Sequence, residues 1–306
     1  MSSPITAPNR LASAEPGRLR RHLGLGPMAA VGADRDGRSG RLELVTTLTA
    51  IVAMSTVVQG PAVWLVAGLV LAGTILGTLQ VLAAIDGPEP ELGVPVESLL
   101  LPSVAALGAV GIIRSVPIGL AIVPALALVA VLIDQALAVE TRIAGHAQGP
   151  TEDDRWRGLS AILVVAFIAF AGIASIIPDG LAGPRADGTP LAPLPIGDLA
   201  LLAVADAVVA ALLGYRAAAL RLASARDAAW AGLTSAVAIA LGAAALRAMG
   251  IPRLIGPALL MLLLYLWDNL HAAPASRRRD PRWLWETIAL AGLGAAVAFW
   301  NLRLVG

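Results

Sequence analysis

The chain has 306 residues, of which 58% are hydrophobic and only 14% are charged. Soluble domains carry about a quarter charged residues, so this composition excludes an ordinary soluble protein and indicates that lipid is the main solvent. The absence of cysteine excludes disulfides, thiolate chemistry and cysteine–zinc sites, while the net charge of +1 carries little information by itself.

Residues 1–41 form a polar segment that is rich in arginine and proline and holds no apolar run long enough to insert into a membrane. A secretory signal needs about 7–15 apolar residues behind its basic start, and none follow Arg18, Arg20 and Arg21. We therefore expect a cytoplasmic tail that is disordered or loosely attached to the membrane surface. A wrongly assigned start of translation is the alternative.

From residue 42 onward, apolar runs bounded by charge, proline or glycine predict about nine spanning helices, since each crossing needs about 20 apolar residues. The fold class is therefore all-α, a polytopic membrane helix bundle with a transmembrane domain at 42–306. The first span is the weakest, because threonine and serine dilute it, and the third is short. The predicted spans are 42–59, 62–85, 98–113, 117–139, 158–177, 198–217, 229–248, 253–270 and 283–302.

The arginines predict the orientation, because basic residues in short loops are retained on the cytoplasmic side. A cytoplasmic amino terminus leaves only five of the 22 basic residues, all of them arginine, on the outside: Arg114, Arg185, Arg247, Arg253 and Arg303. The tryptophans agree, since each of the seven falls near a predicted helix end and none falls mid-span. We expect the plasma membrane of a bacterium, with an external carboxyl terminus.

Residues 106–137 and 240–271 resemble each other, which predicts an internal duplication. Arg114 and Pro124 are ten residues apart, as are Arg247 and Pro257. We predict two parallel repeats of four helices, repeat A at 42–140 and repeat B at 158–271, followed by an extra helix at 283–302. Coincidence between segments rich in alanine and leucine is the alternative.

Asp206 is the outstanding candidate for function, because it lies near the middle of the sixth predicted span. An ionised carboxylate there costs several kcal/mol unless it is paired or hydrated. The functional interpretation is a carboxyl in a proton or cation path. The structural alternative is a carboxyl that hydrogen-bonds to Thr234 or Ser235 on the next helix.

Arg114 and Arg247 depart from the charge rule at equivalent places in the two predicted repeats. They are candidates for an anion or lipid-headgroup site, and the alternative is a long side chain that snorkels to the interface. Pro124 and Pro257 are expected to lie deeper than the first turn of their helices, where a role in packing is favoured and a kink beside a cavity is the alternative.

A third set of polar residues ends the fourth and eighth predicted spans on the cytoplasmic side: Asp134, Gln135, Asp268 and Asn269. Paired acids and amides can hold a divalent cation, while the simpler interpretation is a polar end to each span. The three histidines have no metal-ligand spacing. We therefore predict no metal site, no cofactor and no nucleic-acid partner.

The function that these features favour is a small ion-coupled transporter or permease. A non-catalytic membrane subunit or assembly factor is the main alternative, and a lipid-linked enzyme at the cytoplasmic face is a further one. The expected partners are the lipid bilayer, a small ion or solute, and a membrane protein or a second copy of the chain.

Overall fold

The computed structural model describes residues 37–60, 62–83, 95–145, 149–177, 180–181, 194–222, 224–251 and 254–305. Helices are the only regular secondary structure in these segments, which confirms the predicted all-α fold class. Residues 1–36 of the predicted tail lie outside the described residues. Residues 37–41 belong to the first helix, which therefore begins inside the segment predicted as a tail.

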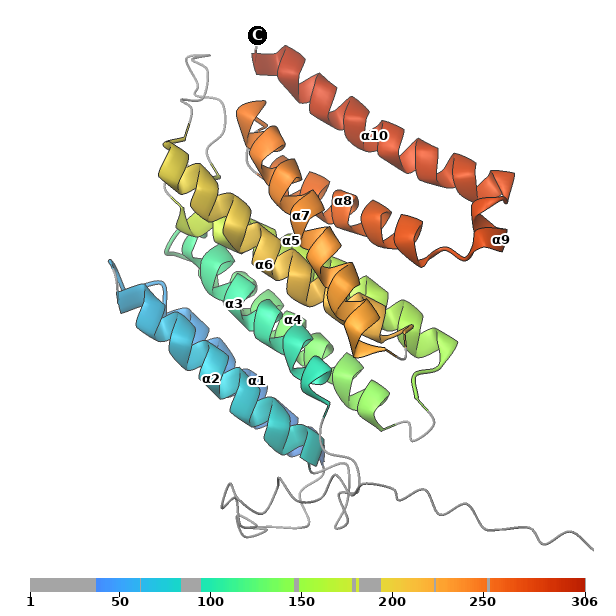
Figure 1. Cartoon of the computed structure of the whole chain (residues 1–306). Helices are drawn as coiled ribbons and strands as arrows, with labels where there is room; N and C mark the ends of the chain where they lie inside the picture. Colours follow the sequence, from blue (N-terminus) through green and yellow to red (C-terminus); the bar gives the residue numbers. More distant parts are fainter. Residues whose placement is uncertain are drawn as a thin grey trace, which may run out of the picture. The chain divides into compact units, whose positions relative to one another are not determined.

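The helices follow one another with short connections wherever the connection is described, and Figure 1 shows the long ones running side by side. In chain order they are α1 (Gly37–Met54), α2 (Ala62–Ala83), the 3-10 turn η2 (Val96–Leu99), α3 (Leu100–Arg114), α4 (Ile122–Ala144), α5 (Glu152–Ile176), α6 (Ile196–Ala219), α7 (Ala225–Ala248), α8 (Ile255–Ala272), α9 (Ala275–Arg278) and α10 (Pro281–Val305).

Eight helical segments of the described chain are long and apolar enough to cross a membrane: α2, η2 with α3, α4, α5, α6, α7, α8 and α10. The protein is therefore a multi-pass helical membrane protein. α1 is not among them, because Arg38, Arg41 and Glu43 fall within it and its threonines lower its hydropathy. It still packs into the bundle, since Leu48 and Val52 are fully buried.

Local signals place several helix starts away from the hydrophobic boundaries. α5 begins six residues before the predicted span, because Thr151 and Asp154 form a capping box in which each side chain bonds the other residue's backbone N–H. α4 begins five residues late, after Gly119. Pro124 and Pro257 are the third residues of α4 and α8. The prediction that both prolines lie deeper than the first turn is therefore wrong, and a proline in the first turn removes no helical hydrogen bond.

The described core has two large clusters of buried side chains and a small third one around Ala174, Ile177 and Leu202, and α3 contributes to both large clusters. Ala106, Ala109 and Val110 of α3 pack with residues of α1, α2 and α4, while Leu101 and Ala105 pack with residues of α4 to α8. Figure 1 shows α3 between the α1–α2 pair and α6. A helix that is apolar on every side is buried, which explains why α3 is the central helix of the described bundle.

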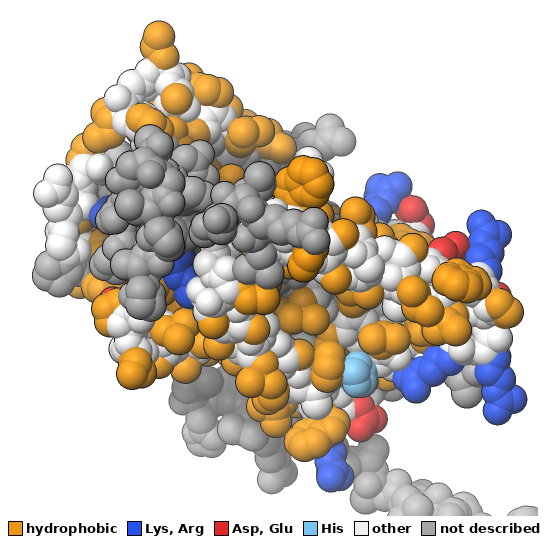
Figure 2. Space-filling model, turned by 90° about the horizontal axis from the view of Figure 1, so that it is seen from above, with side chains coloured by type: hydrophobic (Ala, Val, Ile, Leu, Met, Phe, Trp, Pro, Cys, Tyr) orange, Lys and Arg blue, Asp and Glu red, His pale blue; other side chains and the backbone are white. Residues whose placement is uncertain are grey.

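The surface outside this core is largely apolar. Figure 2 shows hydrophobic side chains over most of the described part of one face, with charged side chains gathered toward one end. Arginines of α1, the α4–α5 and α6–α7 connections and α9 all belong to that end of the helices, which we call the arginine-rich end. Such a surface suits a bilayer, where lipid rather than water covers apolar side chains.

Candidate functional site

Asp206 lies near the middle of α6, on the face that packs into the bundle. The buried residues of α6 recur at helical spacing and include Leu202, Asp206, Ala210 and Leu213. Asp206 is 1% exposed, and its Oδ1 has no hydrogen-bond partner among the described residues. Because leaving a buried polar atom unpaired costs about 1–3 kcal/mol, such an atom calls for an explanation, which can be a water, an ion or a functional role.

Asp206 lines a cavity of about 40 Å³ that is bounded by α5, α6, α7 and α8. Arg247 is the other charged residue of the lining, and apolar residues such as Phe170, Leu202 and Leu260 complete the wall. A water molecule needs about 10–15 Å³ of such space, so the cavity has room for one to three waters or for a small cation. The structure thus brings together two of the predicted site residues, Asp206 and Arg247.

The end of α7 positions Arg247 at this cavity. Gly250 adopts the left-handed conformation at φ 69°, which favours glycine. The N–H of Ile251 donates to the carbonyl of Leu246 at 3.1 Å, and the N–H of Gly250 donates to that of Arg247 at 3.0 Å. This Schellman motif ends α7 sharply and turns Ile251 into the cavity wall.

Small residues bring α6 and α7 into close contact beside Asp206. A Cβ atom on Gly214 would collide with Ser235, and one on Gly232 would lie 2.6 Å from the carbonyl oxygen of Ala211. The hydroxyl of Ser235 donates to the carbonyls of Ala210 and Gly232 at 3.1 and 2.8 Å. That of Thr234 donates to the carbonyl of Ala231. Both hydroxyls that were expected to satisfy Asp206 therefore bond to backbone instead.

Arg114 has a different environment from Arg247. Its Nη1 donates to the carbonyls of Ser55 and Val58 at 2.5 and 2.7 Å, beyond the last residue of α1. These carbonyls follow the end of a helix, where no intrahelical partner remains. Arg114 thus stabilises the α1–α2 connection, and it does not line the cavity of Asp206.

Asp134 and Asp268 are each held by an arginine. Nε and Nη2 of Arg41 donate to the two carboxylate oxygens of Asp134 at 2.7 and 3.1 Å. Arg221 binds Asp268 in the same bidentate manner. Paired in this way, neither carboxylate offers a bare charge to a divalent cation. Within the described segments, no three His, Asp or Glu side chains come together as a metal site.

The amides next to these aspartates, Gln135 and Asn269, have different surroundings. Gln135 lines an apolar groove between α4 and α5. The Oδ1 of Asn269 accepts a hydrogen bond from the indole N–H of Trp283 at 3.4 Å, which joins α8 to α10. The predicted position of Asp134 and Gln135 at the end of a helix is wrong, since α4 continues to Ala144, whereas Asp268 and Asn269 do lie near the end of α8. The four polar residues do not form one described cluster.

Sequence reasoning missed a buried ion pair between α4 and α6. Nε and Nη2 of Arg216 donate to the two oxygens of Glu140 at 2.9 and 2.6 Å, and the residues are 5% and 1% exposed. They are 76 positions apart, so no local spacing pairs them. Helical periodicity offered a signal, since Glu140 continues the buried stripe of Ile133 and Leu137.

Comparisons with known protein families, with curated proteins and with solved structures find no match to this chain.

Proposed function

We propose that this protein is a small ion-coupled transporter in which Asp206 binds and releases the coupling proton or cation. The observation that carries the proposal is a mid-helix carboxyl, 1% exposed, with an unpaired oxygen and a cavity beside it. A charge at this depth costs several kcal/mol unless it is paired or hydrated. Ionisation of Asp206 would therefore depend on water or a cation that enters the cavity, which is how an ion-coupling residue works.

The arrangement of the helices supports the proposed duplication of four plus four. α1 packs against α2 and α4 as α5 packs against α6 and α8, and α3 packs against α4 as α7 does against α8. Arg114 ends α3 where Arg247 falls one residue before the end of α7. Secondary transporters are often built from such repeats. The residue that corresponds to Asp206 is near Leu69 in α2, so the proposed ion site belongs to one repeat only.

The experiment measures ion flux into vesicles that contain the purified full chain. A trapped pH-sensitive dye reports protons and a trapped sodium-sensitive dye reports Na⁺ while a potassium gradient with valinomycin sets the membrane potential. We expect flux of one ion above that of protein-free vesicles, and its loss in Asp206→Asn. Asp198→Asn is the matched control, because it makes the same chemical change in the first turn of the same helix, away from Asp206.

Two results contradict this proposal. One is equal flux of both ions in the parent protein and in protein-free vesicles. The other is unchanged flux in Asp206→Asn in a preparation where the variant is folded and reconstituted to the same density as the parent.

A non-catalytic membrane subunit is the second candidate function, and α10 favours it. The long helix on which α10 chiefly packs is α8 (Figure 1). Four large side chains of α10 are more than half exposed: Trp285, Leu293, Phe299 and Trp300. A partner helix would bury this edge, although lipid also suits it. A subunit predicts that one fixed partner co-purifies in mild detergent and is lost when Leu293 and Phe299 are replaced by alanine.

A further inference from the structure

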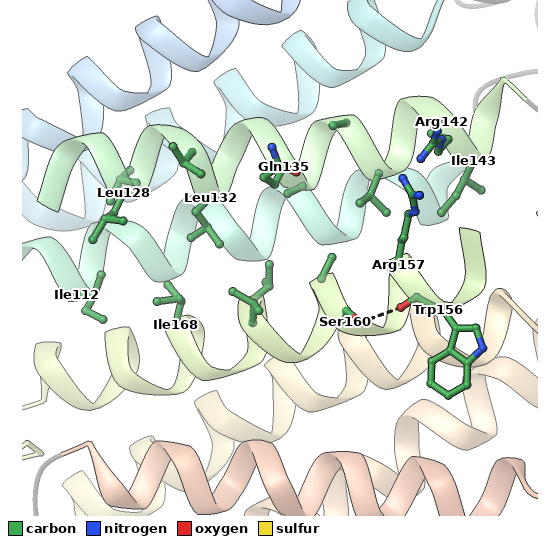
Figure 3. A pocket seen from close by; sticks show the side chains of 18 of the residues that line it. Ile112, Leu128, Leu132, Gln135, Arg142, Ile143, Trp156, Arg157, Ser160 and Ile168 are labelled. Carbon is green, nitrogen blue, oxygen red and sulfur yellow. Dashed lines mark hydrogen bonds between the residues drawn. The ribbon is translucent and has the colours of Figure 1, made fainter. Parts of the chain in front are cut away.

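An apolar groove runs along the surface between α4 and α5. It has a volume of about 830 Å³, and Ile112 and Ile113 of α3 form part of its floor. Figure 3 shows Leu128 and Leu132 on α4, facing Ile112 and Ile168 across the groove. Lining residues such as Leu128, Val131 and Val164 are more than half exposed, so the groove opens toward the surroundings of the bundle.

The groove lies beside a close packing of α3 on α5. A Cβ on Gly108 would lie 2.8 Å from the Cα of Ala169, and one on Gly111 would collide with the backbone of Gly172. The hydroxyl of Ser175 also donates to the carbonyl of Gly111 at 2.6 Å. Small residues let these two backbones approach, while α4 also packs on α3 and the groove lies between α4 and α5.

Two arginines lie at the arginine-rich end of the groove. Arg142 comes from α4 and Arg157 from α5, and Figure 3 shows Arg157 reaching from α5 toward Arg142. Their side chains are 49% and 52% exposed. The indole of Trp156 lies at the same end and is more than half exposed, as expected for a side chain at the headgroup level of a bilayer.

Three other arginines of the same end are held by protein carboxylates in a different way from these two. Arg41, Arg216 and Arg221 each form a bidentate pair with one carboxylate. The Nε of Arg142 lies 3.9 Å from Asp154, and about half of the Arg142 side chain remains exposed to a ligand in the groove. Arg157 has an exposed pair with Asp153, one helical turn earlier in α5, and such surface pairs are weak. An anion with several oxygens can compete for both guanidinium groups.

We propose that this groove binds one anionic phospholipid of the bilayer. Its phosphate lies between Arg142 and Arg157, since guanidinium groups bind phosphate oxygens through paired N–H donors. An acyl chain follows the groove toward Leu128. At 1.5 Å per residue, the 14 residues from Arg142 to Leu128 span about 21 Å. One leaflet has roughly 15 Å of hydrocarbon, so the groove is long enough for an acyl chain.

The apolar walls select a lipid over a free anion. A soluble phosphate would use only the arginine end and leave the rest of the groove without a function. Basic pockets between transmembrane helices are known to bind anionic headgroups on the cytoplasmic side, and the proposed orientation places this end there. The site is separate from Asp206, which lines another cavity, so the two proposals can fail independently.

The test is native mass spectrometry of the purified full chain in mild detergent with phosphatidylglycerol or phosphatidylcholine added. We expect phosphatidylglycerol to bind more tightly, and Arg142→Gln with Arg157→Gln to weaken it about tenfold or more, since each basic residue near a membrane surface contributes about 1 kcal/mol. Arg226→Gln with Arg282→Gln is the matched control. It removes the same charge at the same end, from exposed arginines that do not line the groove, and we expect less than a twofold change.

A second pair of variants tests the chain-binding part of the groove without any change of charge. Val131→Trp with Val164→Trp fills the groove between its exposed walls, and we expect the same loss of phosphatidylglycerol. Folding is verified by circular dichroism and by monodisperse elution. Should a double variant fail to fold, each single variant carries the same test with a smaller expected loss.

Several outcomes overturn the proposal. Equal losses in the two arginine pairs indicate unspecific attraction of charge, and equal binding of the two lipids removes the role of the arginines. Displacement of the lipid by millimolar inorganic phosphate identifies a free-anion site. If a second protein stays bound to the chain after the arginines are replaced, the groove holds a partner chain and not a lipid.

Discussion

Two buried carboxyl groups, Glu140 on α4 and Asp206 on α6, are equally shielded but have different surroundings. Both residues are 1% exposed. Glu140 receives two hydrogen bonds from Arg216, while Oδ1 of Asp206 receives none from the described residues. A buried charge with a bidentate partner helps to define how two helices meet. A buried carboxyl without one gives the fold little, and this contrast is the reason to assign function to Asp206.

The partly exposed pairs of Asp134 with Arg41 and Asp268 with Arg221 complete the comparison. They have the same bidentate chemistry as the pair of Glu140, but their side chains are 22–30% exposed. Solvent and headgroups therefore screen them. The described residues thus include a buried and paired carboxylate, a buried carboxyl with one oxygen unpaired among them, and paired carboxylates that are partly exposed, and each class predicts a different response to substitution.

The largest effect is expected from breaking the buried pair. Arg216→Met leaves Glu140 as an uncompensated buried charge, and we expect the free energy of unfolding to fall by about 3–5 kcal/mol. Unfolding is followed by titration with a denaturing detergent in mixed micelles. Glu140→Leu combined with Arg216→Met removes both charges and should restore most of the loss. A double variant as unstable as the single one would show that the pair is not the cause.

A smaller effect is expected at Asp206. Asp206→Asn keeps the shape of the side chain and removes no hydrogen bond from Oδ1, so the free energy of unfolding should change by no more than about 1 kcal/mol. The same titration measures it, and Asp198→Asn is again the control. A loss as large as that of Arg216→Met would mean that Asp206 has a structural partner, and the contrast between the two buried carboxyls would not hold.

The smallest effects are expected for the accessible pairs. Arg41→Gln and Arg221→Gln should each lower the free energy of unfolding by about 0.2–1 kcal/mol, because solvent screens an exposed ion pair. If both variants lose a similar small amount of stability, the comparison is sharpened, because burial then explains why the pair of Glu140 with Arg216 contributes more than these two pairs. A loss of several kcal/mol in either variant would show that the exposed fraction does not govern how much these pairs contribute.

Much of the fold could be predicted from the sequence, and some helix ends could not. The apolar runs identified every long helix, because transfer of about 20 apolar residues into lipid depends on composition and not on partners. The start of α5 was missed, since its first turn is charged, although Thr151 and Asp154 carry a recognisable capping pattern. The predicted depth of Pro124 and Pro257 in their helices was wrong for a similar reason, because hydropathy does not show where the first turn begins.

Some features of the candidate site also follow from the local sequence, and others depend on which helices pack together. A single carboxylate in an apolar span singled out Asp206 from the sequence alone. Its missing partner, its cavity with Arg247, the capping role of Arg114 and the groove between α4 and α5 depend on which helices pack together. The pair of Glu140 and Arg216 joins residues 76 positions apart, and no repeat or spacing brings them together in the sequence.

The sequence by itself thus determined that the chain is a multi-pass helical membrane protein and that Asp206 is its unusual residue, because both follow from the free energy of moving single side chains from water to lipid. Only the tertiary structure decided which charges are neutralised and which remain unpaired. That outcome depends on hydrogen bonds a few ångströms long between helices that are distant in the chain. Asp206 is a candidate because of its sequence, and it remains one because no described neighbour satisfies its Oδ1.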